Sequence, residues 1–418
     1  MKFTENRIIV FLIIGACCLV AALAQASDQI CPSPLPKQYQ NVQAGNVVSA
    51  YFGNWDVYGG NSYQIDRIAA VADKLTHVVY GFMKPDEVNG TCKPHDVWAD
   101  IGAYDGYQTK IGGNFAKMIA LKKQFPHLKI LLSVGGGTYN KQLLAIAKDK
   151  EKLMKFAQSC VDMLDFYEHS YISPDKEIKT NHLTYEGLFD GLDIDWEWSP
   201  SQLTADMAQA YTKFIHEVKR LLNLRNKNSM LTVALQVTPK IYSNLELEKI
   251  AQYIHWFHVM AYDFYGPHSG LVGFNAPICD TRHVYSVDGA VQALMQRGVS
   301  PDKMVLGLPL YGYVYPDSAG YKSTIKNKDT IKSMSYQVMK TKYLANPDYK
   351  KGWNTYEKSS SAYNSKDRVF ISYDSKESLM EKTKFAKNKK MQGVVLWRLS
   401  GDDAQHSMVN GIVAAMKN

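Results

Sequence analysis

The chain has 418 residues, of which 46% are hydrophobic and 12% aromatic, and its formal net charge is +8. This apolar content excludes a disordered chain and is enough for a large buried core. The charge could indicate an anionic partner, but the lysines are spread along the sequence, so we expect no nucleic-acid partner. We expect the densest basic cluster to be the solvated face of a helix near the C-terminus. It comprises Lys382, Lys384, Lys387, Lys389 and Lys390.

Residues 1–26 have the pattern of a secretory signal peptide. A basic start and an apolar run at 8–23 precede two small-residue cleavage patterns, which end at Ala24 and Ala26. Two alternatives stay open. One is a retained membrane anchor, for which the apolar run is short, and the other is a lipid attached at Cys17. We predict cleavage and export, with no stable membrane insertion.

Four cysteines remain once the signal is removed, and their spacing matches no metal-binding motif. We therefore expect neither a metal nor a cofactor. An exported protein can carry one or two disulfides, and Cys31 with Cys92 is the first pair to test. The alternative that some cysteines are simply small buried residues also stays open. The other two are Cys160 and Cys279.

Short apolar runs rich in β-branched residues alternate with helical patterns along the chain. Eight strands alternating with helices predict an α/β fold, a (β/α)8 TIM barrel. An open doubly wound sheet is the alternative, but it would usually show a glycine-rich phosphate turn after its first strand. The expected strands are 46–52, 76–82, 129–134, 187–195, 230–237, 255–262, 303–308 and 391–397. The expected helices are 114–125, 144–166, 204–222, 245–253 and 287–297, with a last one after residue 404.

The interval between the seventh and eighth strands is too long for a single crossover helix. Residues 374–388 supply that helix, and the tyrosine-, lysine- and serine-rich residues 313–373 predict a small α+β insertion on the rim. The catalytic barrel would then comprise 46–312 and 374–418, after an irregular N-terminal lead at 27–45. We expect a monomer.

Three acidic residues, Asp193, Asp195 and Glu197, lie two apart at the end of the fourth strand, with apolar residues between them. Alternate side chains of a strand share a face, so the three carboxyl groups line one face. Three like charges so close together cannot all ionise without a large cost, so one group is expected to hold a proton near neutral pH. Catalytic groups of barrels gather at the C-terminal ends of strands, where this row lies.

Three other strand ends carry chemistry. The third ends in Ser133 and a run of glycines, which let a ligand or a side chain approach the backbone. The sixth places the phenol of Tyr262 beside the carboxyl of Asp263. The eighth ends in Trp397, a flat apolar platform suited to the face of a sugar ring.

These motifs, in this order and spacing, resemble glycoside hydrolase family 18, the chitinases. The family patterns DGxDxDWE, SxGG and MxYD match Asp190–Glu197, Ser133–Gly136 and Met260–Asp263. The insertion resembles that of the subgroup with deep, tunnel-like clefts. Three departures concern subsite affinity and preferred chain length rather than the chemistry. They are Gly137, where many members have tryptophan; Tyr313, where many have arginine; and Leu235-Gln236-Val237 at the end of the fifth strand.

Hydrolysis of a glycosidic bond needs a proton donor and stabilisation of an oxocarbenium-like carbon. Glu197 reaches furthest toward the cleft and is the predicted general acid/base. No second carboxyl faces it at the separation that a two-carboxylate retaining enzyme needs. The resemblance implies substrate-assisted catalysis, in which the substrate's 2-acetamido oxygen attacks and forms an oxazolinium ion. Asp195 would bind the acetamido N–H, Tyr262 would hold the acetamido oxygen, and Asp193 would share a proton with Asp195.

The resemblance also implies which residues bind the sugar and support the acidic row. Ser133 and Tyr51 would support Asp193. The reacting sugar would be bounded by Asp263, Met260, Trp397, Phe82 and Tyr311. Four further tryptophans are as well explained by packing as by sugar binding. They are Trp55, Trp98, Trp198 and Trp353.

The predicted function is therefore that of an exported hydrolase of β-1,4-N-acetylglucosaminide bonds in chitin and chitooligosaccharides. Within the same family, an endo-β-N-acetylglucosaminidase or a peptidoglycan hydrolase would use the same residues. A chitinase-like lectin, which binds without cutting, is the alternative of another class. Such lectins typically lose the acid, whereas Glu197 is intact here.

Overall fold

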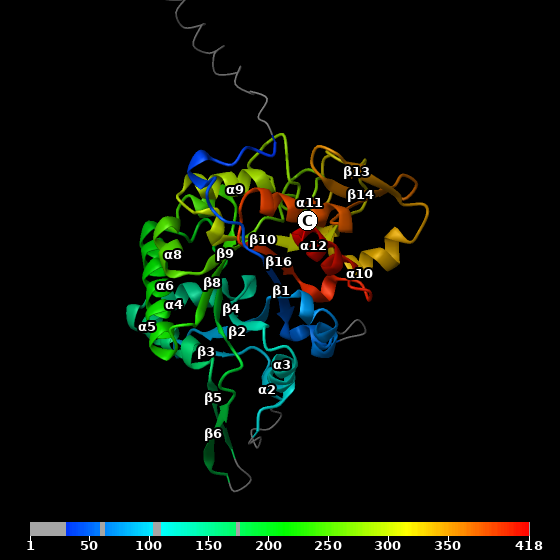
Figure 1. Ribbon diagram of the computed structural model, residues 1–418. Helices are drawn as coiled ribbons and strands as arrows, with labels where there is room; N and C mark the ends of the chain where they lie inside the picture. Colours follow the sequence, from blue (N-terminus) through cyan, green and yellow to red (C-terminus); the bar gives the residue numbers. More distant parts are fainter. Residues whose placement is uncertain (1–30, 59–62, 103–109, 173–175, 418) are drawn as a thin grey trace, which may run out of the picture. The chain divides into compact units, whose positions relative to one another are not determined.

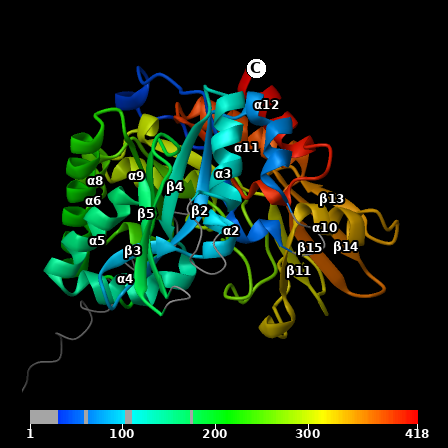
Figure 2. The ribbon, with the colours of Figure 1, turned by 90° about the horizontal axis from the view of Figure 1, so that it is seen from below.

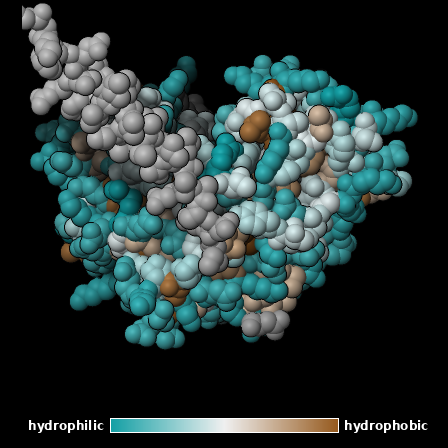
Figure 3. All heavy atoms as spheres, turned by 90° about the horizontal axis from the view of Figure 1, so that it is seen from above, coloured by the Kyte–Doolittle hydropathy of each residue, from teal (hydrophilic) through white to brown (hydrophobic). Residues whose placement is uncertain are grey.

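The computed structural model describes residues 31–58, 63–102, 110–172 and 176–417, so the predicted signal peptide lies outside the described residues. All the elements below belong to one compact unit that begins at Leu35 (Figure 1). No helix of the described residues has the length and apolar character needed to cross a membrane. On the face shown in Figure 3, hydrophobic residues occur only as small scattered patches on a largely hydrophilic surface.

Eight parallel strands form a closed barrel, because β16 pairs with both β10 and β1. The predicted TIM barrel is confirmed, and the open sheet was the wrong alternative. The fourth strand begins later than expected, at Gly191 rather than at residue 187. In chain order the barrel strands are β1 (Val47–Gly53), β2 (His77–Asp86), β4 (Lys129–Gly135), β7 (Gly191–Asp195), β8 (Met230–Gln236), β9 (Trp256–Met260), β10 (Met304–Pro309) and β16 (Gly393–Trp397).

Large apolar side chains fill the barrel interior. Tyr51, Leu131 and Trp256 belong to one buried cluster, and Trp397 packs against it from the C-terminal end. Every residue of β1 and β10 is buried, as expected for parallel strands that are covered on both faces. The site at the strand ends therefore stands on a rigid, fully packed floor.

The helices surround the barrel (Figure 2). The predicted helix 144–166 is wrong as a single element, because Asp149 accepts hydrogen bonds from the N–H groups of Glu151 and Lys152 and so starts a new helix. Residues from 166 onward instead belong to the β5–β6 hairpin (Phe166–Ile172, Ile178–Thr184), which projects from the barrel in Figure 1. The helices include α2 (Val97–Ile101), α3 (Gly113–Gln124), α4 (Asn140–Ala147), α5 (Lys150–Asp162), α6 (Ala205–Arg225), α7 (Pro239–Tyr242), α8 (Leu247–Tyr253), α9 (Val287–Gln296), α11 (Lys376–Asn388) and α12 (Ser407–Lys417).

The chain between β10 and β16 contains a five-stranded antiparallel sheet, which lies to one side of the barrel in Figure 2. It has a buried core of its own around Met339, Ala362 and Ile371. Its first strand begins at Tyr311, two residues before the expected start of the insertion. The elements are β11 (Tyr311–Tyr315), β12 (Lys332–Ser335), α10 (Tyr336–Met339), β13 (Lys350–Asn354), β14 (Ser359–Asn364) and β15 (Val369–Tyr373).

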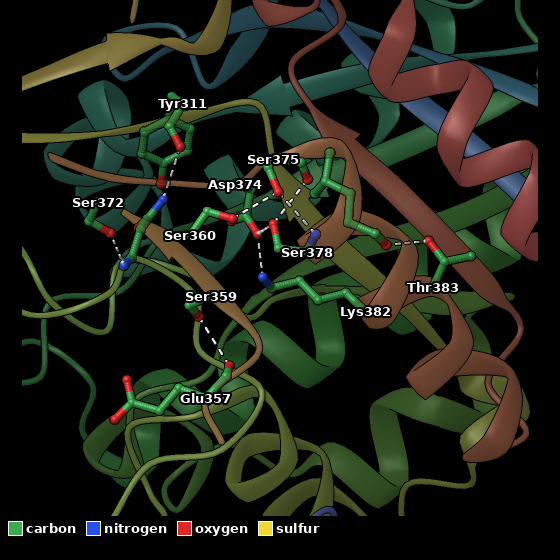
Figure 4. Close-up of polar contacts among 12 residues, drawn as sticks. Tyr311, Glu357, Ser359, Ser360, Ser372, Asp374, Ser375, Ser378, Lys382 and Thr383 are labelled. Carbon is green, nitrogen blue, oxygen red and sulfur yellow. Dashed lines mark hydrogen bonds and ion pairs between the residues drawn. The ribbon is translucent and has the colours of Figure 1, made fainter. Parts of the chain in front are cut away.

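Polar contacts join this sheet to α11 (Figure 4). Ser360 of β14 donates to Ser375, the N-cap of α11, at 2.8 Å. The buried Asp374 accepts from Ser378 at 2.7 Å and pairs with Lys382, which is only 1% exposed. A buried charge needs a partner of opposite charge, and Lys382 and Asp374 are partners of each other.

The expected solvated lysine face is therefore wrong for two of the five lysines. Lys382 pairs with Asp374, and Lys389 lies 2.7 Å from the buried Oδ1 of Asp288. Burial lowers the pKa of Lys389, and the carboxylate partly offsets that effect. The number and spacing of the lysines did not predict these pairs, because Asp374 and Asp288 both lie outside α11.

The predicted Cys31–Cys92 disulfide is wrong. Cys31 and Cys279 each take part in a disulfide, whereas Cys92 and Cys160 are free and buried. Cys92 lies on β3 (Thr91–Pro94), where its N–H donates to Ser159 of α5 at 2.9 Å. Cys92 is 4% exposed, so it is one of the small buried residues of the alternative interpretation.

Candidate active site

The acidic row runs from the barrel core into a cavity of about 600 Å³. Asp193 is 0% exposed and Asp195 4%, while Glu197, two residues past the end of β7, is only partly buried. Asp195 and Glu197 line the cavity together with the ends of β8, β9 and β16. The cavity therefore lies at the C-terminal end of the barrel, where the strand alternation predicted it.

Asp193 is surrounded by donors. Its Oδ2 accepts from Tyr51 at 2.8 Å and from Ser133 at 2.6 Å, and its Oδ1 accepts from Thr232 at 2.6 Å and lies 3.1 Å from Nδ1 of His258. Burial alone would raise the pKa of Asp193, but His258 and the hydroxyl groups outweigh it and hold the pKa below its usual value. Asp193 is the ionised member of the row.

Asp195 has the opposite environment. Burial, followed by the charges of Glu197 and Asp193, raises the pKa of Asp195 well above its usual value. Its Oδ1 is buried and has no hydrogen-bond partner among the described residues. A proton near neutral pH is therefore favoured on Asp195 rather than on Asp193.

The environment of Glu197 also favours its protonated form, because it raises the pKa of this carboxyl. Burial is the main cause that raises the pKa of Glu197, the charge of Asp263 adds to it, and the backbone N–H of Gly137 opposes both. A Cβ at Gly137 would lie 3.0 Å from Oε1 of Glu197, so a larger residue there would displace the carboxyl group. At Gly135, with φ of +115°, a Cβ would lie 2.2 Å from the backbone oxygen of Asp195. Both glycines let the third strand end approach the acidic row.

The end of β9 supplies a second set of polar groups. Tyr262 is partly buried and lines the cavity, and burial followed by the charge of Asp263 raises its pKa well above the usual value. Asp263 has a left-handed backbone, with φ of 58°, and is exposed to the cavity. Its Oδ1 accepts from Tyr311 at 2.5 Å and from Tyr313 at 2.8 Å.

Aromatic rings close the floor. Trp397 lines the cavity, stacks on Phe82 with 6.0 Å between ring centroids, and meets Tyr51 edge-on at 5.2 Å. Phe82 in turn stacks on Trp55 at 5.9 Å. Trp198 is buried against Trp196, with ring centroids 4.5 Å apart, so it belongs to the packing.

The structure brings most of the predicted site residues into one cavity and places three behind it. Asp193, Ser133 and Phe82 are buried and do not line the cavity. The lining includes Tyr51, Asp195, Glu197, Met260, Tyr262, Asp263, Tyr311 and Trp397. Among the described residues, no group of three or more His, Cys, Asp or Glu side chains is arranged to hold a metal ion.

Sequence reasoning missed His258, which is 1% exposed. The indole N–H of Trp256 donates to Nε2 of His258 at 3.0 Å, so the ring proton must lie on Nδ1. Nδ1 faces Asp193 at 3.1 Å and the hydroxyl of Tyr51 at 3.0 Å. The available signal was strand alternation, because His258 lies two residues before the predicted site residue Met260 and so shares its face.

Comparison with known proteins assigns the chain to a family. The sequence matches the family model "Glycosyl hydrolases family 18" over residues 47–402. The chain belongs to glycosyl hydrolase family 18. This family 18 member is 27% identical to Chitinase A1 from Niallia circulans over 85% of its own length, but it spans only 56% of that protein. It is also 27% identical to Chitinase 1 from Aphanocladium album, with 91% of this chain and 88% of that protein covered.

Solved structures of family 18 chitinases share the fold. The Group IV chitinase of Ostrinia furnacalis has a TM-score of 0.75 at 23% identity, covering 89% of this chain and all of that one. The Class V chitinase of Nicotiana tobaccum has a TM-score of 0.69 at 20% identity, covering 89% of this chain and 99% of that one. At these identities the likeness concerns the fold alone.

Proposed function

We propose that this family 18 glycoside hydrolase is an exported chitinase, which cleaves β-1,4 bonds between N-acetylglucosamine units. The observation that carries the proposal is the convergence of Glu197, Asp195 and Tyr262 in one cavity, with Trp397 in its lining and with no partner for Oδ1 of Asp195 among the described residues. The names of the relatives support this substrate class, and the N-terminal pattern supports export.

Glu197 acts as the general acid and then as the general base. Its raised pKa favours the protonated form, and that proton passes to the leaving glycosidic oxygen as the C–O bond breaks. After the leaving sugar departs, the same carboxylate takes a proton from the incoming water. The anomeric carbon then gains a hydroxyl group, and Glu197 returns to its protonated state.

The nucleophile belongs to the substrate. The acetamido oxygen of the sugar attacks its own anomeric carbon and forms an oxazolinium ion, which water opens with overall retention. The orphan Oδ1 of Asp195 is suited to accept the acetamido N–H, and the hydroxyl of Tyr262 is suited to donate to the acetamido oxygen. Asp195 is buried at the end of β7, two residues before Glu197, and the proposed mechanism gives it no role as nucleophile.

The test is product analysis on four substrates side by side: chitin, soluble chitooligosaccharides, a high-mannose glycopeptide and peptidoglycan. We expect release of short N-acetylglucosamine oligomers from the first two and little from the others. Dominant cleavage of the glycopeptide or the peptidoglycan would contradict the proposed substrate. Binding of chitooligosaccharide with no product from any of the four would identify a lectin instead.

A further inference from the structure

The insertion sheet reaches into the catalytic cavity through its first strand. Tyr311 and Tyr313 lie two apart on β11, so both side chains point from the same face of that strand. Both hydroxyls donate to one atom, Oδ1 of Asp263, at 2.5 and 2.8 Å. Tyr313 is 9% exposed and packs with Phe370 of the insertion and with Phe274, which lies between β9 and α9.

The backbone of Asp263 is fixed to the same sheet by a second route. Its N–H donates to Oδ1 of Asn275, which is 1% exposed. The N–H of Asn275 donates to Ser372 of β15 at 2.8 Å, and its side-chain amide donates to the backbone oxygen of Tyr311 at 3.3 Å. Tyr311 and Ser372 lie close together on this face of the sheet (Figure 4). Both the carboxyl and the main chain of Asp263 therefore depend on insertion strands.

The chemistry of the two phenols decides what they do to the carboxylate. A phenol donates a hydrogen bond but carries no positive charge, so it orients the carboxylate without neutralising its field. The negative charge of Asp263 is, after burial, the main cause that raises the pKa of Glu197. A lysine or arginine in the place of Tyr313 would give the same hydrogen bond and cancel much of that charge.

We propose that Tyr311 and Tyr313 form a clamp through which the insertion fixes the Asp263 carboxylate in the cavity that it shares with Glu197, and so tunes the catalytic acid. Tyr313 is then a positioning residue, because it acts on the acid through Asp263. The proposal rests on the proposed function, in which Glu197 is the acid. Other titratable or charged groups around this cavity are Asp193 and Asp195 from β7, Tyr51 from β1, His258 and Tyr262 from β9 and its end, and Lys240, His268 and Tyr285 from the rim loops.

The test uses the full chain with Tyr313→Phe, which keeps the ring and removes only the hydroxyl. Tyr363→Phe is the matched control, because it removes an insertion phenol that donates to the backbone oxygen of Ser318 at 3.1 Å, away from Asp263. Two readouts are compared. One is the titration of Glu197 followed by NMR of carbon-13-labelled glutamate and assigned with Glu197→Gln. The other is the pH profile of kcat/KM on a chitooligosaccharide.

Tyr313→Phe is expected to move the Glu197 titration midpoint and the alkaline limb of kcat/KM downward by about half a pH unit. Adding Tyr311→Phe should move both further, and Tyr363→Phe should move neither. An unchanged Glu197 midpoint in Tyr313→Phe, or an equal shift in the control, would overturn the clamp.

The clamp at Asp263 and the role of Glu197 as the acid can be disproved separately. A shifted midpoint with an unmoved rate profile would leave the clamp standing and remove Glu197 as the rate-determining acid. Should Tyr313→Phe not fold, Asp263→Asn removes the same charge while keeping the side-chain shape. Its Glu197 midpoint must also fall, and a midpoint equal to that of the wild type would overturn the proposal.

Discussion

The two carboxylates of β7 have identical chemistry and opposite environments. Four side-chain groups from four other strands surround Asp193, while the Oδ1 of Asp195, two residues further along, has no hydrogen-bond partner among the described residues. Correspondingly, the pKa of Asp193 lies below and that of Asp195 lies above the usual value. The protein itself supplies hydrogen-bond donors to the inner carboxylate, Asp193, and leaves the outer one, Asp195, for a ligand.

Substitution of Glu197, at the cavity end of the row, should have the largest effect on activity. Glu197→Gln preserves size and hydrogen bonding but cannot transfer a proton, so kcat should fall by about three orders of magnitude while oligosaccharide binding persists. Single-turnover rates measure the loss of catalysis, and calorimetry on the same preparation measures whether binding persists. Turnover close to that of the wild type would exclude Glu197 as the acid.

The same substitution at the two aspartates of β7 should have opposite effects on stability at pH 7. Asp193→Asn puts an amide among donors arranged for a carboxylate, and should lower the free energy of unfolding by about 3 kcal/mol. Asp195→Asn removes an unpartnered carboxyl from the interior and should raise it by about 1 kcal/mol. Denaturant unfolding of the three proteins measures both changes. Destabilisation of similar size in both variants would break the comparison.

The pH dependence of these differences follows from the signs of the pKa shifts. Asp193 has a lowered folded-state pKa, so its stabilisation is present above its unfolded pKa and is lost as pH falls through the folded value. Asp195 has a raised pKa, so it favours the fold at acid pH, and that contribution is lost as pH rises through the folded value. The gain from Asp195→Asn should therefore vanish toward pH 4. A gain that grows on acidification would contradict the sign.

The smallest effect concerns a single donor to the inner carboxylate. Thr232→Val removes one hydroxyl from Asp193 and keeps the side-chain shape, so we expect a loss of about 1 kcal/mol of stability. The matched control is Thr383→Val on α11, whose hydroxyl bonds only to a backbone oxygen within its own helix. A change in the acid limb of stability only for Thr232→Val would show that the hydroxyl acts through Asp193, and equal pH dependence in both variants would exclude it.

The sequence predicted what depends on local pattern. Alternating apolar runs located all eight barrel strands, and the two-residue spacing put the carboxyls of β7 on one face, because both features repeat along a single strand. Contacts between side chains of separate elements were not predicted. The donors to Asp193 include His258, which is 65 residues away, and the buried Lys382 pairs with Asp374, which lies just before α11. Such pairs carry no local signal.

The central claim is that the substrate completes the site at Asp195. It is tested most directly by comparing hydrolysis of an aryl chitobioside with that of its fully deacetylated counterpart, under conditions where binding of both is measured. We expect the deacetylated compound to be bound but essentially not cleaved, because it lacks both the attacking acetamido oxygen and the N–H for Asp195. Comparable cleavage of the two compounds, or a covalent sugar trapped on Asp195, would contradict it.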